Sequence, residues 1–144
     1  LQSSEAKARL KPHLMEGNIV KTMSAPWVAI IAHDLDFPDH MERLFPHNLE
    51  AKTWFSDPTV RETTAFRNGT LQSAYFLIAA RALGLDCGPM SGFNNEGVDA
   101  EFFLNDDARK SWRSNWICNL GHGDPDSVFP RSPRFDFEEA CAIL

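Results

Sequence analysis

The segment Gly88–Gly92, Gly-Pro-Met-Ser-Gly, has residue types suited to binding a flat ligand through its backbone. Glycine carries no side chain that would shield the neighbouring amides, so a planar molecule can approach backbone N–H donors there. Proline restricts the backbone further, and we predict a rigid turn with glycine on both sides. This pattern suits a planar cofactor held at the end of a buried helix, although composition alone favours a core helix followed by an ordinary turn.

Two arginines near the end of the sequence, Arg131 and Arg134 in the run FPRSPRF, could bind a phosphate group. Guanidinium groups make charge-assisted and often bidentate hydrogen bonds to phosphate oxygens. The two prolines of the run stiffen it, so the arginines need less ordering on binding. A solvated basic turn beside an acidic terminal helix explains the same residues equally well.

Two other polar segments follow predicted strands. Gly121 and Gly123 flank His122 at the end of one strand, where glycines commonly let a ligand approach, and we include both glycines among the candidate cofactor-binding residues. A surface turn is the favoured interpretation of His122, and no catalytic side chain is assigned. The loop His33–His40 is rich in His and Asp, but its spacing matches no HExxH helix or EF-hand loop, so a polar loop is favoured over a metal site.

Two strands are predicted to support these segments. Trp27–His33, WVAIIAH, is a continuous and partly β-branched apolar run, typical of a strand buried on both faces. Asn115–Leu120 is the second strand, with Trp116, Cys118 and Leu120 on one face. Two strands rarely form a stable sheet alone, so further strands come from weakly patterned segments, from sequence outside this chain or from a partner subunit.

One long helix dominates the predicted helices. Asp57-Pro58 is a typical helix start, and the helix can run to Leu83, as one element or as two that abut. It is almost entirely apolar from Ala74 onward, so it is enclosed either in the core of the chain or between subunits. Shorter helices are predicted with Ser4 as the first cap, over Val98–Phe103 and over Asp136–Leu144.

Length, charge and cysteine spacing exclude several classes of protein. With 144 residues the chain is expected to be one domain, 1–144. Its net charge of −6 argues against a nucleic acid or an anionic membrane as partner, and no apolar run reaches the roughly 18 residues of a membrane span. Cys87, Cys118 and Cys141 form no CxxC pair, so we expect no metal site. Each cysteine is expected to be a small core residue, and the protein is expected to be cytoplasmic.

The run GLDCGPMSGFNNEGVDAEFF resembles the nitroreductase family of flavin mononucleotide (FMN) enzymes, and within it the malonic semialdehyde reductase branch. Further segments carry the resemblance along nearly the whole chain in order: SEAKARLKPHL near the start, LFPHN and WF in the middle, Glu62–Asn68, then NLGHGD and PRSPRFDFEEACAIL at the end. Members of that family have a further N-terminal segment, so the chain is expected to be N-terminally truncated relative to the family.

The resemblance implies an α+β fold, a mixed sheet flanked by helices, in an intertwined homodimer with FMN at the subunit interface. It also implies that Pro89, Met90, Ser91 and Gly92 edge the isoalloxazine ring, and that Arg131 and Arg134 grip the FMN phosphate. Related enzymes often carry an acidic residue where this chain has Ser91.

The activity that the resemblance implies is an FMN-dependent NAD(P)H oxidoreductase with NADH or NADPH as hydride donor. Its small-molecule acceptor would be malonic semialdehyde, reduced to 3-hydroxypropionate as in pyrimidine degradation, or a nitro compound or quinone. Nothing in composition or spacing selects an aldehyde. A flavin-binding or purely structural module without turnover is the alternative, and a metal hydrolase built on the loop His33–His40 is a weaker one.

Overall fold

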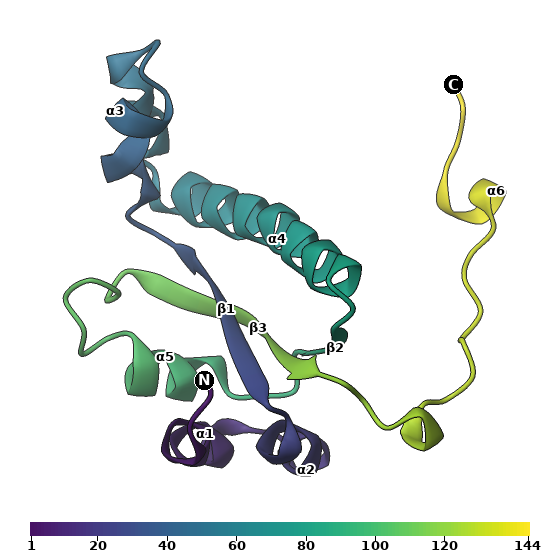
Figure 1. The fold of residues 1–144 in the computed structure, drawn as a ribbon. Helices are drawn as coiled ribbons and strands as arrows, with labels where there is room; N and C mark the ends of the chain where they lie inside the picture. Colours follow the sequence, from purple (N-terminus) through teal and green to yellow (C-terminus); the bar gives the residue numbers. More distant parts are fainter.

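A three-stranded sheet in the order β1-β3-β2 organises the chain, and the computed structural model describes all 144 residues. The strands are β1 (Trp27–Asp34), β2 (Asp86–Met90) and β3 (Trp112–Gly121), and β3 pairs with both neighbours. Helices cover both faces (Figure 1), so the predicted α+β class is confirmed. Both pairings are antiparallel, so the parallel pairs of a mixed sheet do not occur among these three strands.

The two predicted strands are confirmed and a third was missed. β1 begins at the predicted residue, whereas β3 is longer than predicted because a bulge lets it continue past Trp116 towards Trp112. The predicted turn at Gly88–Gly92 is wrong, because Gly88, Pro89 and Met90 belong to β2. An edge strand tolerates Pro89, which has no amide hydrogen to give to the sheet.

Three helices cover one face of the sheet and enclose the core of the chain (Figure 1). They are α1 (Ser4–Leu10), α2 (Glu16–Ser24) and α5 (Asn95–Phe102), with a 3-10 turn between the first two at Lys11–His13. The core between them and the sheet consists of seven buried apolar residues: Leu10, Leu14, Val28, Met90, Phe93, Val98 and Ile117. Burial of apolar surface therefore stabilises the packing of these three helices on the sheet.

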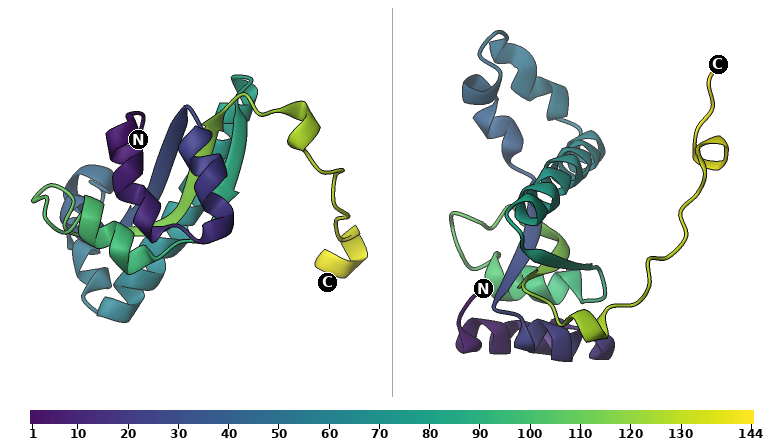
Figure 2. Two further views of the ribbon diagram at one scale, coloured as in Figure 1. Left: turned by 90° about the horizontal axis from the view of Figure 1, so that it is seen from below. Right: turned by 45° about the vertical axis from the view of Figure 1, so that its right-hand side comes forward.

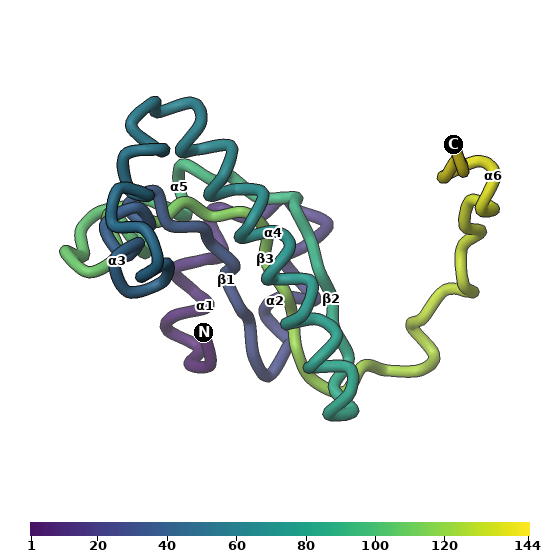
Figure 3. The backbone as a smooth tube through the Cα atoms, turned by 90° about the horizontal axis from the view of Figure 1, so that it is seen from above, coloured from purple at the N-terminus to yellow at the C-terminus, as the bar shows by residue number.

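The long helix α4 (Pro58–Ala82) lies alone across the opposite face of the sheet, as one continuous element (Figures 1 and 3). Asp57 caps it, with Oδ1 accepting hydrogen bonds from the N–H groups of Thr59 and Val60. Its buried residues are the small Ala65, Ser73 and Ala80. The helix is thus not enclosed in the core of this chain. Enclosure between two subunits, the other possibility for this apolar helix, stays a prediction.

Several large apolar side chains of α4 are exposed, whereas Phe66 and Phe76 contact His33 of β1 and Trp116 of β3. Leu71, Tyr75 and Ile78 are 61%, 73% and 64% exposed, and with Val60 they form one stripe that we call the outer face of α4. Their spacing of three, four and eleven residues places them on one side of a helix. No helix of the structure, α4 included, has the length and apolarity that crossing a bilayer requires.

Two segments project from this body. The first, between β1 and α4, contains a 3-10 turn at Phe37–His40, α3 (Met41–Leu44) and a 3-10 helix at Leu49–Phe55. The second is residues 124–144, which we call the C-terminal arm; it carries a 3-10 turn at Pro125–Ser127 and α6 (Phe137–Ala140). The arm runs away from the sheet in all three orientations of the ribbon (Figures 1 and 2).

Three predictions at the chain ends are corrected. Ser3, not Ser4, caps the first helix, because its Oγ accepts the N–H of Ala6. The terminal helix starts with the predicted capping box but ends at Ala140, since a short helix without packing partners is not stable beyond its capped turn. Cys141 is exposed on the arm and is not a core residue.

Candidate functional site

The segment Pro89–Phe93 leaves the end of the edge strand β2 and carries the first candidate site. Pro89 and Ser91 are exposed, whereas Met90 is buried in the core, where its Sδ accepts a 3.5 Å hydrogen bond from Thr22 Oγ1. The Met90 side chain is therefore unavailable to a ligand. What the segment offers outward is backbone, the pyrrolidine ring and one hydroxyl, and none of these titrates near neutral pH.

The backbone polar groups of this segment are unevenly paired. The carbonyl of Ser91 accepts the N–H of Phe93 at 3.0 Å, and the carbonyl of Gly92 accepts the N–H of Met15 at 3.0 Å. The N–H groups of Ser91 and Gly92 donate to no acceptor within the chain. Unpaired backbone donors at a partly exposed edge are positioned to bind an acceptor atom of a ligand.

Gly92 has a steric reason to be glycine. A Cβ atom there would lie 2.5 Å from Asn18 Nδ2 and 3.2 Å from Met15 Sδ, which is too close for either contact. Its φ is not positive, since Gly84 is the only residue of the chain with positive φ. The close approach of the Asn18 and Met15 side chains, rather than an unusual backbone conformation, favours glycine at this position.

Gly121 ends β3 and Gly123 follows it, and both make contacts within the chain. A Cβ on Gly121 would lie 2.7 Å from Pro26 Cδ. The N–H of Gly123 donates a 2.8 Å hydrogen bond to Asp86 Oδ2, and Arg81 pairs with the other oxygen of Asp86. Binding of a cofactor by Gly121 and Gly123 stays a prediction.

The Asp86 carboxylate sets the point at which the C-terminal arm leaves the sheet. The hydrogen bond from Gly123 and then that from Arg81 lower the pKa of Asp86 below its ordinary value of 3.8. A lowered pKa in the folded state means that the anchor is complete above pH 3.8 and is lost as the pH falls through the lowered pKa.

We therefore expect the Gly123 amide to be protected from hydrogen exchange at neutral pH and to lose that protection in acid below pH 3.8. Substitution Asp86→Asn should abolish the pH dependence while leaving α4 folded. Asp106→Asn is the matched control, because its pKa is also lowered, by Arg109 and by the N–H of Ala108, but far from Gly123. Loss of Gly123 protection in acid that persists in Asp86→Asn would contradict the anchor.

Arg131 and Arg134 lie on the C-terminal arm, which the chain does not fold back against Ser91 (Figure 1). Both are exposed, and neither takes part in an ion pair of the chain. Arg134 Nη1 donates only to carbonyls of its own turn, to Ser132 at 2.7 Å and to Pro133 at 3.0 Å. The chain alone thus does not bring the arginines to the backbone donors, and a shared site requires a second copy.

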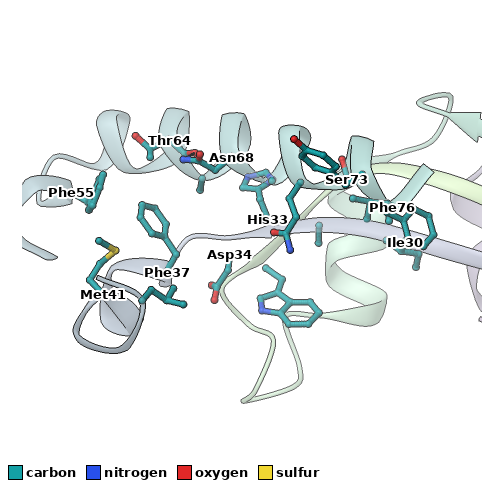
Figure 4. A pocket seen from close by; sticks show the side chains of 18 of the residues that line it. Ile30, His33, Asp34, Phe37, Met41, Phe55, Thr64, Asn68, Ser73 and Phe76 are labelled. Carbon is teal, nitrogen blue, oxygen red and sulfur yellow. Dashed lines mark hydrogen bonds between the residues drawn. The ribbon is translucent and has the colours of Figure 1, made fainter. Parts of the chain in front are cut away.

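A groove that the sequence did not reveal lies between α4 and the end of β1 (Figure 4). Its volume is about 1050 Å³, which is at the upper end of small-molecule sites, about 300–1,000 Å³. The projecting segment closes one end with Phe37, Met41 and Phe55. The groove brings together side chains from four separate stretches of sequence, so no local motif marks it; the small residues Ala65 and Gly69 on α4 are the one available signal.

His33 is the titratable side chain at the centre of this groove. Its ring meets that of Phe66 edge to face at 5.6 Å, and its buried Nδ1 has no hydrogen-bond partner. Burial lowers the pKa of His33 below 6.5, so the ring is neutral at pH 7. The neighbouring Asp34 builds the loop, since its Oδ1 accepts from Ser111 Oγ at 2.6 Å and from the N–H of Asp36 at 2.9 Å.

The sheet also places two cysteines close together. Cys118 is fully buried, and burial first, then the neighbouring Cys87, raise the pKa of its thiol to about 11. A thiol with so high a pKa is not a nucleophile at neutral pH. No group of three or more His, Cys, Asp or Glu side chains that could hold a metal ion is present.

Comparison with known proteins identifies the family. NADH dehydrogenase/NAD(P)H nitroreductase HadB of Ralstonia pickettii is 56% identical to this chain over 146 residues, which cover 99% of the chain and 72% of that protein. The chain belongs to the NAD(P)H nitroreductase family. A relative of the same description from Caulobacter vibrioides is 53% identical over 142 residues, 99% of the chain and 71% of that protein. No protein-family model matches the chain.

Solved structures of nitroreductases share the fold. Nitroreductase ydfN of Bacillus subtilis superposes with a TM-score of 0.86 at 20% identity, over 100% of this chain and 75% of that one. A nitroreductase of Exiguobacterium sibiricum, solved in complex with FMN, superposes with a TM-score of 0.83 at 18% identity, over 99% and 73%. The predicted nitroreductase-like fold is therefore confirmed.

Proposed function

We propose that this nitroreductase family member is an FMN-dependent NAD(P)H oxidoreductase that works as a homodimer. The observation that carries the proposal is the pair of unpaired N–H groups on Ser91 and Gly92 at the open edge of β2. The acceptor atoms of a flavin, at N5 and O4 of its ring, need such donors, and the Ser91 hydroxyl is the one polar side chain beside them. The relatives named NAD(P)H nitroreductase and the FMN complex of a fold neighbour support the choice of flavin.

The residues present fit FMN. Ser91 and Gly92 would hold the ring edge, with the exposed ring of Pro89 beside them, and Arg131 and Arg134 of a second copy would bind the phosphate. Bound FMN would supply the redox chemistry, the transfer of a hydride from NADH or NADPH to the acceptor. The chain's own part is to bind and orient, which agrees with a segment that carries no titratable side chain.

The homodimer accounts for two apolar surfaces that the chain leaves exposed. One is the outer face of α4, and the other is the C-terminal arm, where Phe129 and Phe135 are 89% and 80% exposed. Patches of this size in a soluble protein mark interaction sites. Pairing of two copies through α4 would cover the first, and the arm of each copy would then lie against its partner.

Malonic semialdehyde is the acceptor we propose for this site, with nitro compounds and quinones as the other candidates. A small acceptor suits a site whose chemistry comes from the cofactor and whose walls offer backbone donors rather than charged side chains. Rates of NADH oxidation with each acceptor, compared at equal enzyme and flavin concentration, select among them. A rate with malonic semialdehyde below that with every nitro compound and quinone would contradict this choice.

The decisive experiment measures hydrogen exchange of the Ser91 and Gly92 amides with and without FMN. Without flavin both amides should exchange freely, and FMN should slow the exchange by at least about tenfold, the effect of one hydrogen bond of about 1.4 kcal/mol. Bleaching of the flavin band by NADH then distinguishes turnover from a flavin-binding module without activity. FMN bound without protection of either amide would contradict the assigned contact.

A further inference from the structure

The Gly92 carbonyl accepts two hydrogen bonds from the first turn of α2. One comes from the N–H of Met15 at 3.0 Å and the other from Asn18 Nδ2 at 2.9 Å. A carbonyl oxygen has two lone pairs, so this acceptor is fully used. Asn18 is half-buried, and its donation to Gly92 is the side-chain contact between α2 and the residue that follows Ser91.

These bonds determine where the unpaired Gly92 N–H points. The Gly92 carbonyl lies in the same planar peptide as the N–H of Phe93, so holding one orients the other. That N–H donates to the Ser91 carbonyl at 3.0 Å, and this carbonyl shares a peptide plane with the N–H of Gly92. Asn18 is therefore linked to the Gly92 N–H through two hydrogen bonds and two rigid peptide units.

A second contact of α2 fixes the residue before Ser91. Thr22, one turn beyond Asn18, is fully buried, and its hydroxyl donates to Met90 Sδ. Thr22 Oγ1 also accepts a 3.4 Å hydrogen bond from Asn119 Nδ2 of the central strand. Helix α2 thus holds Met90 by its side chain and Gly92 by its carbonyl, and Ser91 is exposed between the two.

We infer that Asn18 is a positioning residue for flavin: it holds the Ser91–Gly92 turn so that the Gly92 N–H faces the ligand. This inference rests on the proposed function, because it assigns a role towards the flavin that Ser91 and Gly92 bind. It also explains why residue 92 is glycine, since Asn18 Nδ2 occupies the place of a Cβ. Asn18 touches neither the flavin nor the acceptor in this arrangement and is not a catalytic residue.

The test is Asn18→Asp in the flavin-loaded protein at pH 7.5. A carboxylate has the shape of the amide but only acceptor atoms, so it repels the Gly92 carbonyl and releases the turn. We expect FMN to remain bound through its phosphate. Protection of the Gly92 amide by FMN should fall about tenfold, and kcat should fall by a similar factor with a smaller change in KM. Asn18→Ala, which removes the donor without adding charge, should show the same pattern if Asn18→Asp does not fold.

Asn105→Asp is the matched control. Asn105 Nδ2 also donates to a backbone carbonyl, that of Ala100 at 3.4 Å, but Asn105 lies beyond α5 and away from Ser91 and Gly92. This variant should leave Gly92 protection and kcat unchanged.

Three results would overturn the inference. Gly92 protection and kcat that match the wild type in both Asn18 variants would contradict the inference about Asn18 and leave the proposed function intact. A lower Tm with unchanged protection and kcat per bound flavin would show that Asn18 only stabilises the fold. A wild-type protein without bound flavin would instead contradict the proposed function and the inference with it.

Discussion

Replacing Leu71 and Ile78 with glutamate should convert the proposed homodimer to a monomer and release its flavin. Both side chains lie on the outer face of α4 and are more than half exposed in the single chain. In a symmetric dimer each substitution acts twice, so four apolar contacts of about 1.5 kcal/mol or more are lost, about 6 kcal/mol in total. That loss raises the dimer Kd by about four orders of magnitude, before the cost of burying carboxylates is added.

Sedimentation velocity over a range of protein concentrations measures this effect, and absorbance of the flavin band in the same run reports the cofactor. Val20→Glu is the matched control, because Val20 is an exposed apolar residue on α2, across the sheet from α4. It should leave both the dimer and its flavin intact. A wild-type monomer, or a dimer that survives both glutamates, would show that the outer face of α4 is not the interface.

The exposure of α4 shows what the sequence could and could not predict about the fold. Its length and its cap at Asp57 were visible, and they predicted the long helix correctly apart from one end residue. Its apolar composition predicted an enclosure that the single chain does not provide. Composition did not reveal which side faces the sheet, because size rather than hydrophobicity decides it. A Cβ on Gly69 would lie 2.9 Å from the Cβ of His33, so a larger residue would not fit where α4 passes over His33.

The edge strand β2 was missed for a related reason. Gly88 and Pro89 are turn signals in isolation, and the strand they belong to has five residues with no apolar alternation. Pairing with β3 is a tertiary contact between residues far apart in the sequence, such as Pro89 opposite Cys118, and no local pattern encodes it. The backbone donors predicted for this segment are nevertheless present, at Ser91 and Gly92, because the strand ends there.

The C-terminal arm carries apolar side chains that have no packing partner within this chain. Phe129, Phe135 and Phe137 have the composition of a core segment, yet all three are exposed. Apolar residues that find no partner within their own chain are covered only when another molecule supplies the surface. The candidate site is divided in the same way: its backbone donors lie at the sheet edge, and its predicted phosphate ligands lie on the arm.

Substitution of Arg131 or Arg134 by alanine should weaken FMN binding by roughly 10–100-fold, because a hydrogen bond to a charged group contributes about 1.5–3 kcal/mol. Riboflavin, which lacks the phosphate, should bind the wild type and both variants equally. Arg109→Ala, an exposed arginine that pairs with Asp106 on the connection between α5 and β3, is the control and should change neither affinity. Fluorescence quenching of the two flavins during titration gives each Kd. An equal loss for riboflavin and FMN would mean that the arginines hold the arm in place rather than the phosphate, whereas a loss confined to FMN, and reduced by added salt, is what direct ion pairing requires.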